Sequence, residues 1–394
     1  LGNSNFKAVN GPSSSNLRLP TGVASDGRIL VVADTDNNRV LIWNQIPSQD
    51  SVPANVVLGQ ADFTTNTVNF GTGDPRVPNA SSMKGPQGVW IQDGRLFVAD
   101  TGNNRVLSWN QVPTANNTPA TMVVGQSAFE RAVVSSLLDP GLAAKVDNML
   151  NQVSVSSDGT RLFVADLGQN RVMVWNRIPT QNGAPADIAL GQPDMESGFA
   201  NHVTKLCQPI PKQNENDPDF FPAMCAATLS FPRAVLAAGG RLFVADGGND
   251  RILVWNKIPT NSGQRADVIL GQISEFINEN SDSANPLGRS SANTVRTPMG
   301  LAWDGNNLFV ADPFNRRVVV FTPADERLLP TAARNSASRE VYAIGAVTLT
   351  GNIQKDDEIK ITIQGVDYTY KVKETDDLEK VATQVVQVIN GGQG

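Results

Sequence analysis

A carboxylate and a guanidinium recur five residues apart through most of the chain. Carboxylates can act as general acids, general bases or metal ligands, so these pairs invite a catalytic interpretation. A chain rarely carries five equivalent active sites, however, and in the first two copies an Asn-Asn pair, which tolerates a left-handed turn, separates the two members. Bidentate hydrogen bonds can instead clamp such a hairpin. We therefore predict that the pairs brace turns; they are Asp34/Arg39, Asp100/Arg105, Asp166/Arg171, Asp246/Arg251 and Asp312/Arg317.

Few other residues are suited to catalysis or metal binding. His202 is the one histidine of the chain, and a lone loop histidine is more often a surface residue than a catalyst. The fragment Asp34-x-Asp36-x-Asn38 has the start of a calcium-loop spacing, but it lacks the remaining ligands and is not repeated. The sequence has no Gly-x-Ser-x-Gly, no phosphate loop and no nucleophile beside a base. We predict no catalytic residue, no metal ligand and no cofactor.

The two cysteines, Cys207 and Cys225, lie in the longest non-repeated stretch, 18 residues apart. They have no Cys-x-x-Cys spacing and only one histidine accompanies them, which makes a poor zinc site. A disulfide that closes an exposed loop is the preferred interpretation. It implies an oxidising compartment, and we expect an extracellular or cell-surface location.

A long sequence repeat predicts the strands and turns that position these residues. The aspartates are separated by 66, 66, 80 and 66 residues, and each belongs to a unit such as "GPQGVWIQDGRLFVADTGNNRVLSWNQVPT", which is followed by "ATMVVGQSAF". Each unit has four short apolar stretches divided by turn signals such as Asp-Gly. Four-stranded units repeated around an axis predict an all-β protein, a β-propeller, with both faces of every blade buried.

The repeated text resembles the NHL repeat, in the form found in bacterial secreted proteins. The shared pattern is Pro-x-Gly-Val-Ala, then Leu-Phe-Val-Ala-Asp, then Asn-x-Arg-Val-x-x-Trp, over residues 1 to about 345. The resemblance implies a propeller used for binding or scaffolding, and in some relatives a lyase or a lactone hydrolase. The lyase relatives need histidine metal ligands, which no repeat here carries. Lactonase-like relatives use acidic and amide ligands around the axis, and that alternative stays open.

Blade number depends on the chain ends. Five repeats favour five blades, and "LGNSNF" at 1–6 matches the fourth strand of a unit, so it could complete the fifth blade. The segment "VYAIG" at 341–345 competes for that place, and a sixth blade built from the C-terminal segment stays open. Two incomplete ends also suggest head-to-tail strand addition between copies, although fragmentation of the sequence explains them equally well.

Recurring tryptophans and non-repeated loops have different predicted roles. Because they recur at one strand position, we predict that four tryptophans pack blades together: Trp43, Trp109, Trp175 and Trp255. The long connections lie on the same face as the Asp/Arg turns, and we expect binding there, to a ligand that the sequence does not identify; they are 64–85, 127–149, 192–229 and 272–296.

After the last repeat the sequence pattern changes. We predict a propeller over 1–322, a linker over 323–340 and a small partial α+β module over 341–394. The module reads as strands "AVTLTG", "EIKITIQG" and "VDYTYKVK" followed by a helix capped by Thr375. It resembles modules of bacterial surface and phage structural proteins. Missing sequence or a partner chain could complete it.

Charge and hydropathy limit the choice of partners. The formal net charge is -6 and charged residues make up 18%, so we expect no nucleic-acid partner, and no apolar run is long enough for a membrane span. The sequence predicts a secreted or surface-exposed bacterial propeller that acts as a non-catalytic binding or structural module. Its partner would be another protein or a second copy, and a polymer of copies is one form that self-association could take. The alternative is a metal-dependent hydrolase or lyase with its site on the ring axis.

Overall fold

A computed structural model describes residues 11–132, 144–212, 217–272, 274–276, 294–322, 354–363, 366–377, 380–381 and 384–385. The chain divides into two compact units, Leu1–Val320 and Phe321–Gly394. Both are described below, each by itself. Two sequence segments proposed to complete blades, 1–6 and 341–345, lie outside the described residues, as does the predicted strand 346–351.

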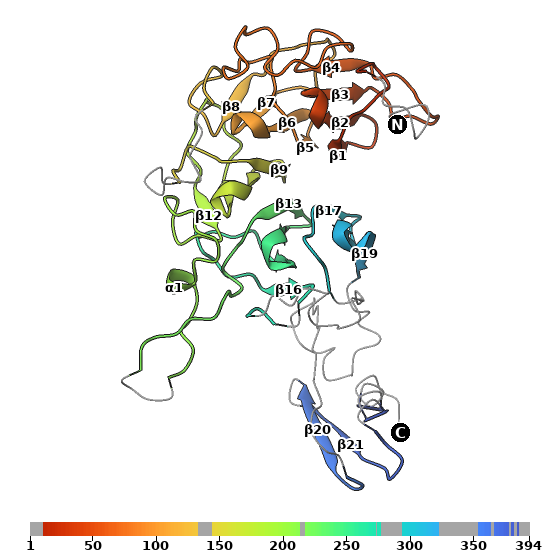
Figure 1. The fold of residues 1–394 in the computed structure, drawn as a ribbon, viewed down its shortest axis with the longest axis vertical. Coiled ribbons are helices and arrows are strands. Elements are labelled where there is room, and N and C mark those ends of the chain that lie inside the picture. Colours follow the sequence, from red (N-terminus) through yellow and green to blue (C-terminus); the bar gives the residue numbers. More distant parts are fainter. Residues whose placement is uncertain are drawn as a thin grey trace. The chain divides into compact units, whose positions relative to one another are not determined.

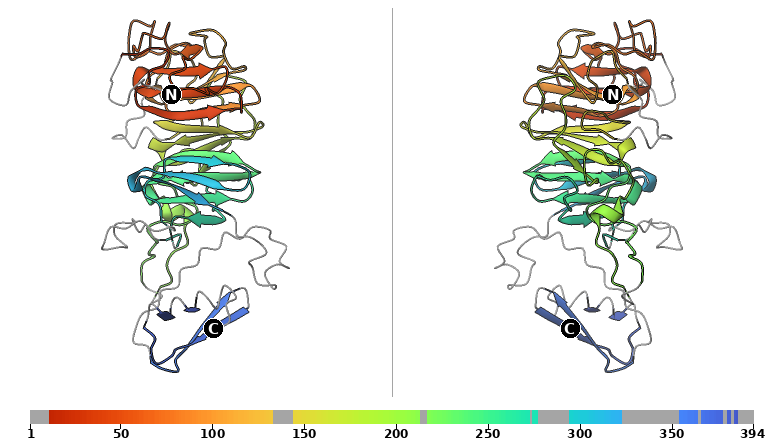
Figure 2. Two further views of the ribbon diagram at one scale, coloured as in Figure 1. Left: turned by 90° about the vertical axis from the view of Figure 1, so that its right-hand side faces the viewer. Right: turned by 90° about the vertical axis from the view of Figure 1, so that its left-hand side faces the viewer.

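The first unit is built from five antiparallel β-sheets, the blades of a propeller (Figures 1 and 2). Blade 1 consists of β1 (Pro20–Ser25), β2 (Leu30–Asp34), β3 (Arg39–Trp43) and β4 (Val56–Leu58). Blade 2 consists of β5 (Val89–Gln92), β6 (Arg95–Asp100), β7 (Arg105–Trp109) and β8 (Met122–Val124). Blade 3 consists of β9 (Gln152–Ser157), β10 (Leu162–Asp166), β11 (Arg171–Trp175) and β12 (Ile188–Leu190).

Blade 4 consists of β13 (Pro232–Ala238), β14 (Arg241–Asp246), β15 (Arg251–Trp255) and β16 (Val268–Leu270). In blade 5 the described strands are β17 (Gly300–Trp303), β18 (Leu308–Asp312) and β19 (Arg317–Phe321). Neighbours in sequence are neighbours in each sheet. The prediction of an all-β propeller with five blades is confirmed.

In blades 1 to 4 the second and third strands are buried on both faces, as their near-continuous apolar sequences predict; in blade 5 they are only partly buried. Every residue of β2 and β3 is buried, and the same holds for the equivalent strands of blade 3. Apolar side chains of adjacent blades form shared clusters: Ile42 and Leu58 of blade 1 pack with Val98 and Trp109 of blade 2. Blade-to-blade burial therefore supplies the hydrophobic core.

Three of the recurring tryptophans, Trp109, Trp175 and Trp255, lie inside these shared clusters, whereas Trp43 packs in a cluster of blade 1 alone. Each is at most 2% exposed, and each indole Nε1 donates to a backbone carbonyl nine residues further along the chain. The acceptors are Val52 (2.9 Å), Thr118 (3.0 Å), Ala184 (3.0 Å) and Gln264 (3.1 Å). The indoles thus combine apolar packing with a satisfied donor, the usual arrangement for a buried tryptophan.

The innermost strands approach one another closely around the axis. A Cβ placed on Gly22 of β1 would lie 2.1 Å from the carbonyl oxygen of Gln87, and one on Gly88, directly before β5, would lie 2.8 Å from the carbonyl oxygen of Val153. Between blades 3 and 4, Ser154 Oγ accepts a hydrogen bond from the backbone N–H of Val235 (3.2 Å). Glycine is therefore needed where two backbones meet at this spacing.

One junction differs from the others. The β1 residue Val23 is 68% exposed, whereas its counterparts Val89, Val155 and Val235 are 6%, 3% and 4% exposed. On β19, Val318 and Val320 are 64% and 49% exposed, although the residues at these positions in the other four blades are buried. The seam between blade 5 and blade 1 is thus incompletely covered.

The second unit contains the hairpin β20 (Glu358–Ile363) and β21 (Val366–Lys371). Residues 380–381 and 384–385 are helical. Val381 and Val385 are buried with Tyr370 and Val372 in a small apolar cluster. No helix in the described ranges is long and apolar enough to cross a membrane.

Candidate functional site

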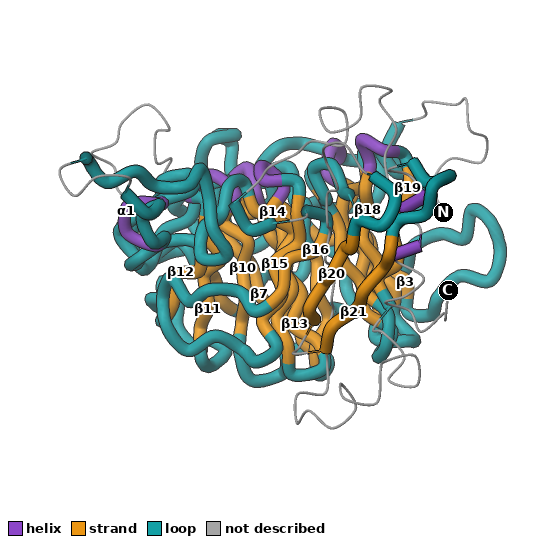
Figure 3. Tube along the Cα trace, turned by 90° about the horizontal axis from the view of Figure 1, so that it is seen from below, coloured by secondary structure: helices purple, strands orange, loops and turns teal. Residues whose placement is uncertain are grey.

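The Asp/Arg pairs occupy the turns between the second and third strands of the blades. In each turn a short 3-10 helix follows the aspartate, and a residue with left-handed backbone precedes the arginine, such as Asn38 (φ 51°) and Asn104 (φ 51°). Aspartate Oδ2 accepts a hydrogen bond from arginine Nε at 2.7 to 2.9 Å in all five pairs. Figure 3 shows these helical turns along one face of the propeller.

The pair in blade 2 illustrates the hydrogen bonds that an Asp/Arg pair makes beyond its own turn. Asp100 Oδ1 accepts a hydrogen bond from the backbone N–H of Lys84 (2.8 Å), and Oδ2 accepts from Asn103 Nδ2 (2.8 Å) as well as from Arg105. The Arg105 guanidinium donates to the carbonyl oxygens of Asn79 (2.9 Å) and Ser82 (2.9 Å). The pair therefore ties its hairpin to the connection that enters the blade.

The buried pairs offer no carboxylate to a substrate. Both side chains are 0% exposed in blades 1 to 4. Burial raises the pKa of Asp166, and the Arg171 guanidinium together with the backbone N–H of Leu150 opposes that rise. Burial also raises the pKa of Asp246, and the Arg251 guanidinium opposes that rise. Because each carboxylate oxygen already accepts hydrogen bonds, the arrangement suits a structural brace, the role predicted from sequence.

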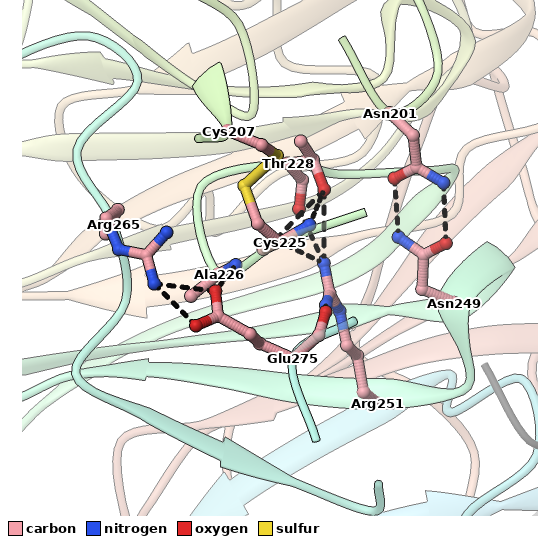
Figure 4. The surroundings of a disulfide bond; sticks show 9 residues. All are labelled: Asn201, Cys207, Cys225, Ala226, Thr228, Asn249, Arg251, Arg265 and Glu275. Carbon is pink, nitrogen blue, oxygen red and sulfur yellow. Dashed lines mark hydrogen bonds and ion pairs between the residues drawn. A yellow bond between two sulfur atoms is a disulfide. The ribbon is translucent and has the colours of Figure 1, made fainter. Parts of the chain in front are cut away.

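The same turns hold the long connections. Asn38 Nδ2 donates to the carbonyl oxygen of Asn66 (3.0 Å), inside the connection 64–85. In blade 4 the side-chain amides of Asn249 and Asn201 exchange two hydrogen bonds of 2.9 Å each, which anchors the connection 192–229 (Figure 4). These contacts place two of the long connections on the turn-bearing face, where binding was expected.

The connection 192–229 contains a disulfide between Cys207 and Cys225, with an S–S distance of 2.08 Å. The predicted disulfide is confirmed. Its surroundings are closely bonded to blade 4: the Arg251 guanidinium donates to the carbonyl oxygen of Cys225 (3.0 Å), and Glu275 Oε2 accepts from the backbone N–H of Ala226 (2.7 Å) (Figure 4). The brace arginine of this blade is therefore also an anchor for the insertion.

Three large apolar side chains of this anchored insertion, and a fourth just after it, are exposed to solvent. Phe199 and Phe220 are 62% and 63% exposed, and Ile210 and Phe231 are also exposed. The backbone N–H of Ile210 donates to the carbonyl oxygen of Phe220 (2.7 Å), which pairs two of them in an isolated antiparallel bridge. We call Phe199, Ile210, Phe220 and Phe231 the insertion patch.

His202 precedes the short helix α1 (Val203–Leu206) in the same insertion. Its ring contacts Phe199 edge-on, with 5.4 Å between ring centroids. Within the part of the chain that the structure describes, no group of three or more His, Cys, Asp or Glu could hold a metal ion.

A second candidate site lies on the axis. The innermost strands of all five blades line a cavity of about 200 Å³, and the lining includes Trp90 of β5 and Arg233 of β13. Arg233 is the one ionisable residue among those lining it. The Trp90 indole Nε1 and the Arg233 Nε are buried donors with no hydrogen-bond acceptor among the described residues.

Sequence reasoning missed both Arg233 and the insertion patch. Aligning the repeats would have revealed Arg233, because the equivalent positions hold Thr21, Gln87, Val153 and Met299, so that one copy alone has a charge there. For the patch the sequence holds no such signal, because the insertion has no counterpart in the other repeats.

The chain is similar to several proteins of known structure. A chain of a nidogen/laminin complex is 11% identical over 77% of this chain and 76% of its own length, with a TM-score of 0.38. A putative 6-phosphogluconolactonase from Bacteroides uniformis is 10% identical over 77% and 66%, with a TM-score of 0.40. A streptogramin B lyase is 8% identical over 79% and 66%, with a TM-score of 0.33.

No protein-family model matches the chain, and no curated protein matches it. Likeness at these identities concerns the fold alone. The resemblance to NHL repeats, and that of the second unit to surface and phage modules, stay predictions.

Proposed function

We propose that this protein is a non-catalytic binding module that acts outside the cell and recognises a protein partner through the insertion patch. The observation that carries the proposal is the exposure of three large apolar side chains on one anchored insertion and of a fourth, Phe231, just after it. Scattered exposed apolar residues are common, but a group of them on one segment is typical of an interaction site. Aromatic residues are also enriched at protein interfaces.

Rigidity of the insertion supports the same proposal. The Cys207–Cys225 disulfide closes a loop within the insertion. The Asn201–Asn249 amide pair joins the insertion to the turn of blade 4, and the bond from Ala226 to Glu275 joins it to the connection that follows β16. Arg265 holds that glutamate in turn, with Nη2 at 2.6 and 2.7 Å from its two carboxylate oxygens. A surface that is already ordered loses less conformational entropy on binding. The disulfide also suits an oxidising compartment, in keeping with an extracellular location.

The first test compares partner capture by the wild type and by the double variant Phe199→Ser, Phe220→Ser. Because aromatic side chains often dominate binding energy, we expect the variant to lose at least about tenfold in partner affinity. Capture from an extracellular extract of the source, quantified by mass spectrometry and followed by titration of the purified partner, measures this loss.

Ile46→Ser is the matched control, because Ile46 is also exposed (49%) and follows β3, at the end of that strand away from the turn-bearing face. All variants should melt at the wild-type temperature, since the replaced side chains lie on the surface. Equal partner affinity of the double variant and the wild type would refute the proposal.

Self-association is a second candidate, favoured by one observation. Among the described strands β19 pairs with β18 alone, and Val318 and Val320 are exposed on its face. An unpaired edge beside an exposed apolar face can accept a strand from another chain. We propose that copies of the chain associate through blade 5 and thereby extend the binding surface.

A further inference from the structure

We infer that the Asp250 side chain makes the contact between blades 4 and 5 pH-sensitive: the contact is weak when the carboxyl is ionised and tight when it is protonated. Asp250 lies in the turn of blade 4, between the 3-10 helix Gly247–Asn249 and β15. Its Oδ1 accepts hydrogen bonds from the backbone N–H (2.7 Å) and the hydroxyl (3.5 Å) of Thr297, which leads into β17 of blade 5. This contact is separate from the insertion patch.

The equivalent residue in blades 1 to 3 has an amide side chain. Asn38, Asn104 and Asn170 share the left-handed backbone of Asp250, and each Oδ1 accepts a backbone N–H that leads into the next blade, at 2.9 to 3.0 Å. In blades 1 and 3 the amide Nδ2 also donates to a carbonyl oxygen of the long connection, at 3.0 Å in both. A carboxylate can only accept hydrogen bonds, whereas a protonated carboxyl accepts and donates as an amide does.

Asp250 differs from the brace aspartates in having no hydrogen-bonded cation. Asp246, the brace aspartate of the same turn, is fully buried and accepts a hydrogen bond from Arg251 Nε (2.8 Å). Asp250 is 7% exposed, and among the described residues its carboxyl accepts hydrogen bonds from Thr297 alone. A largely buried carboxylate without a hydrogen-bonded cation resists ionisation. The remaining exposure keeps the carboxyl within reach of solvent protons.

The charged groups of blade 5 act on Asp250 in opposite directions. Burial is the main cause that raises the pKa of Asp250, and the backbone N–H of Thr297 opposes that rise. The Arg296 guanidinium, in the connection that enters blade 5, also lowers the pKa, whereas the Asp312 carboxylate at the end of β18 raises it. The result is a pKa above the usual value for aspartate, so Asp250 is protonated on acidification before an ordinary surface aspartate is.

The direction of the pH effect follows from this geometry and charge environment. At a pH between the ordinary pKa of aspartate and the raised pKa of Asp250, the folded protein binds a proton at this residue that the unfolded chain does not bind. The contact therefore becomes more stable as the pH falls through the raised pKa, and the ionised carboxyl weakens it fully above that pKa. Blade 5 should respond most, because its strands are only partly buried and weakly buried elements open first.

Thermal melting of the full chain from neutral to mildly acidic pH tests the inference. Asp250→Asn restores the amide of the other blades, and at neutral pH we expect this variant to melt about 2 °C or more above the wild type. The difference should shrink as the pH falls, because the wild-type carboxyl then becomes neutral. Asn170→Asp places a carboxyl at the equivalent position of blade 3; it should melt below the wild type at neutral pH and recover in acid.

Asp50→Asn is the control for net charge, since Asp50 is exposed in the connection between β3 and β4 and its replacement should leave the pH dependence unchanged. Hydrogen exchange followed by mass spectrometry locates the effect. At neutral pH the amides of β17, β18 and β19 should exchange severalfold more slowly in Asp250→Asn than in the wild type. A melting difference that is the same at every pH overturns the inference, as does equal exchange of blade 5 in the two proteins.

Discussion

At the residue scale, the repeated aspartate and arginine are understood through burial. The Asp/Arg spacing and the Asn-rich turns were readable from sequence because each repeats with the blades, and five equivalent environments require the same side chains. The carbonyl oxygens that the guanidinium reaches were not predicted, although they lie at fixed offsets along the chain: Phe63 and Phe129, each 24 residues after its arginine, end the repeated text LGQADF and VGQSAF.

Removal of one brace carboxylate should destabilise the ring. Asp100→Ala leaves the Arg105 guanidinium buried and unpaired, and we expect a loss of about 3–5 kcal/mol in the free energy of unfolding. Chemical denaturation followed by tryptophan fluorescence measures it. Asp74→Ala, which breaks an exposed pair with Arg76, should change stability far less. Equal effects of the two substitutions would contradict the bracing role.

At the element scale, the innermost strands set how closely the blades pack. The sequence predicted strands at these positions from their Val- and Trp-rich text, and the turn signals located their ends. It could not predict that neighbouring strands meet at backbone distance, because this contact joins residues about one repeat apart. For the same reason the cavity that these strands enclose was not foreseen.

The glycine positions of the inner strands should differ in their tolerance of a methyl group. Gly88→Ala places a Cβ 2.8 Å from Val153 O and Ser154 Cα, and we expect a loss of about 1–3 kcal/mol in stability. Gly300→Ala is the matched control in blade 5, where the nearest atom is Ala311 Cβ at 3.4 Å. Thermal melting should give a lower midpoint for Gly88→Ala alone; a similar fall for both would argue against close strand contact.

At the scale of the whole molecule, the five repeats correctly predicted five blades, whereas the state of the last seam could not be derived from them. The repeat pattern predicts the same burial for blade 5 as for the other blades, yet Val318 and Val320 of this blade are exposed. Burial at that seam depends on what lies beside the blade in space, which the local pattern does not encode.

Self-association should follow from that exposed face. We expect negative-stain electron microscopy of the native material to show assemblies larger than one ring, because association would remove apolar surface from water. The double variant Val318→Lys, Val320→Lys should give single rings, and Ile46→Lys should behave as the wild type. Single rings from the wild type at all concentrations would rule out the association.

The insertion between blades 3 and 4 has a consequence for how fast the chain folds. In blades 1 to 4 the side chain of the residue with left-handed backbone accepts a hydrogen bond from a backbone N–H that leads into the next blade. These partners are 47 residues apart in three cases but 61 apart between Asn170 and Phe231. The added loop-closure entropy is only about 0.2 kcal/mol, which slows that step by about 1.5-fold. Since each blade forms from local hairpins and docks onto its neighbour, folding can start at any blade and spread. The chain therefore gains its longest surface loop with almost no kinetic penalty.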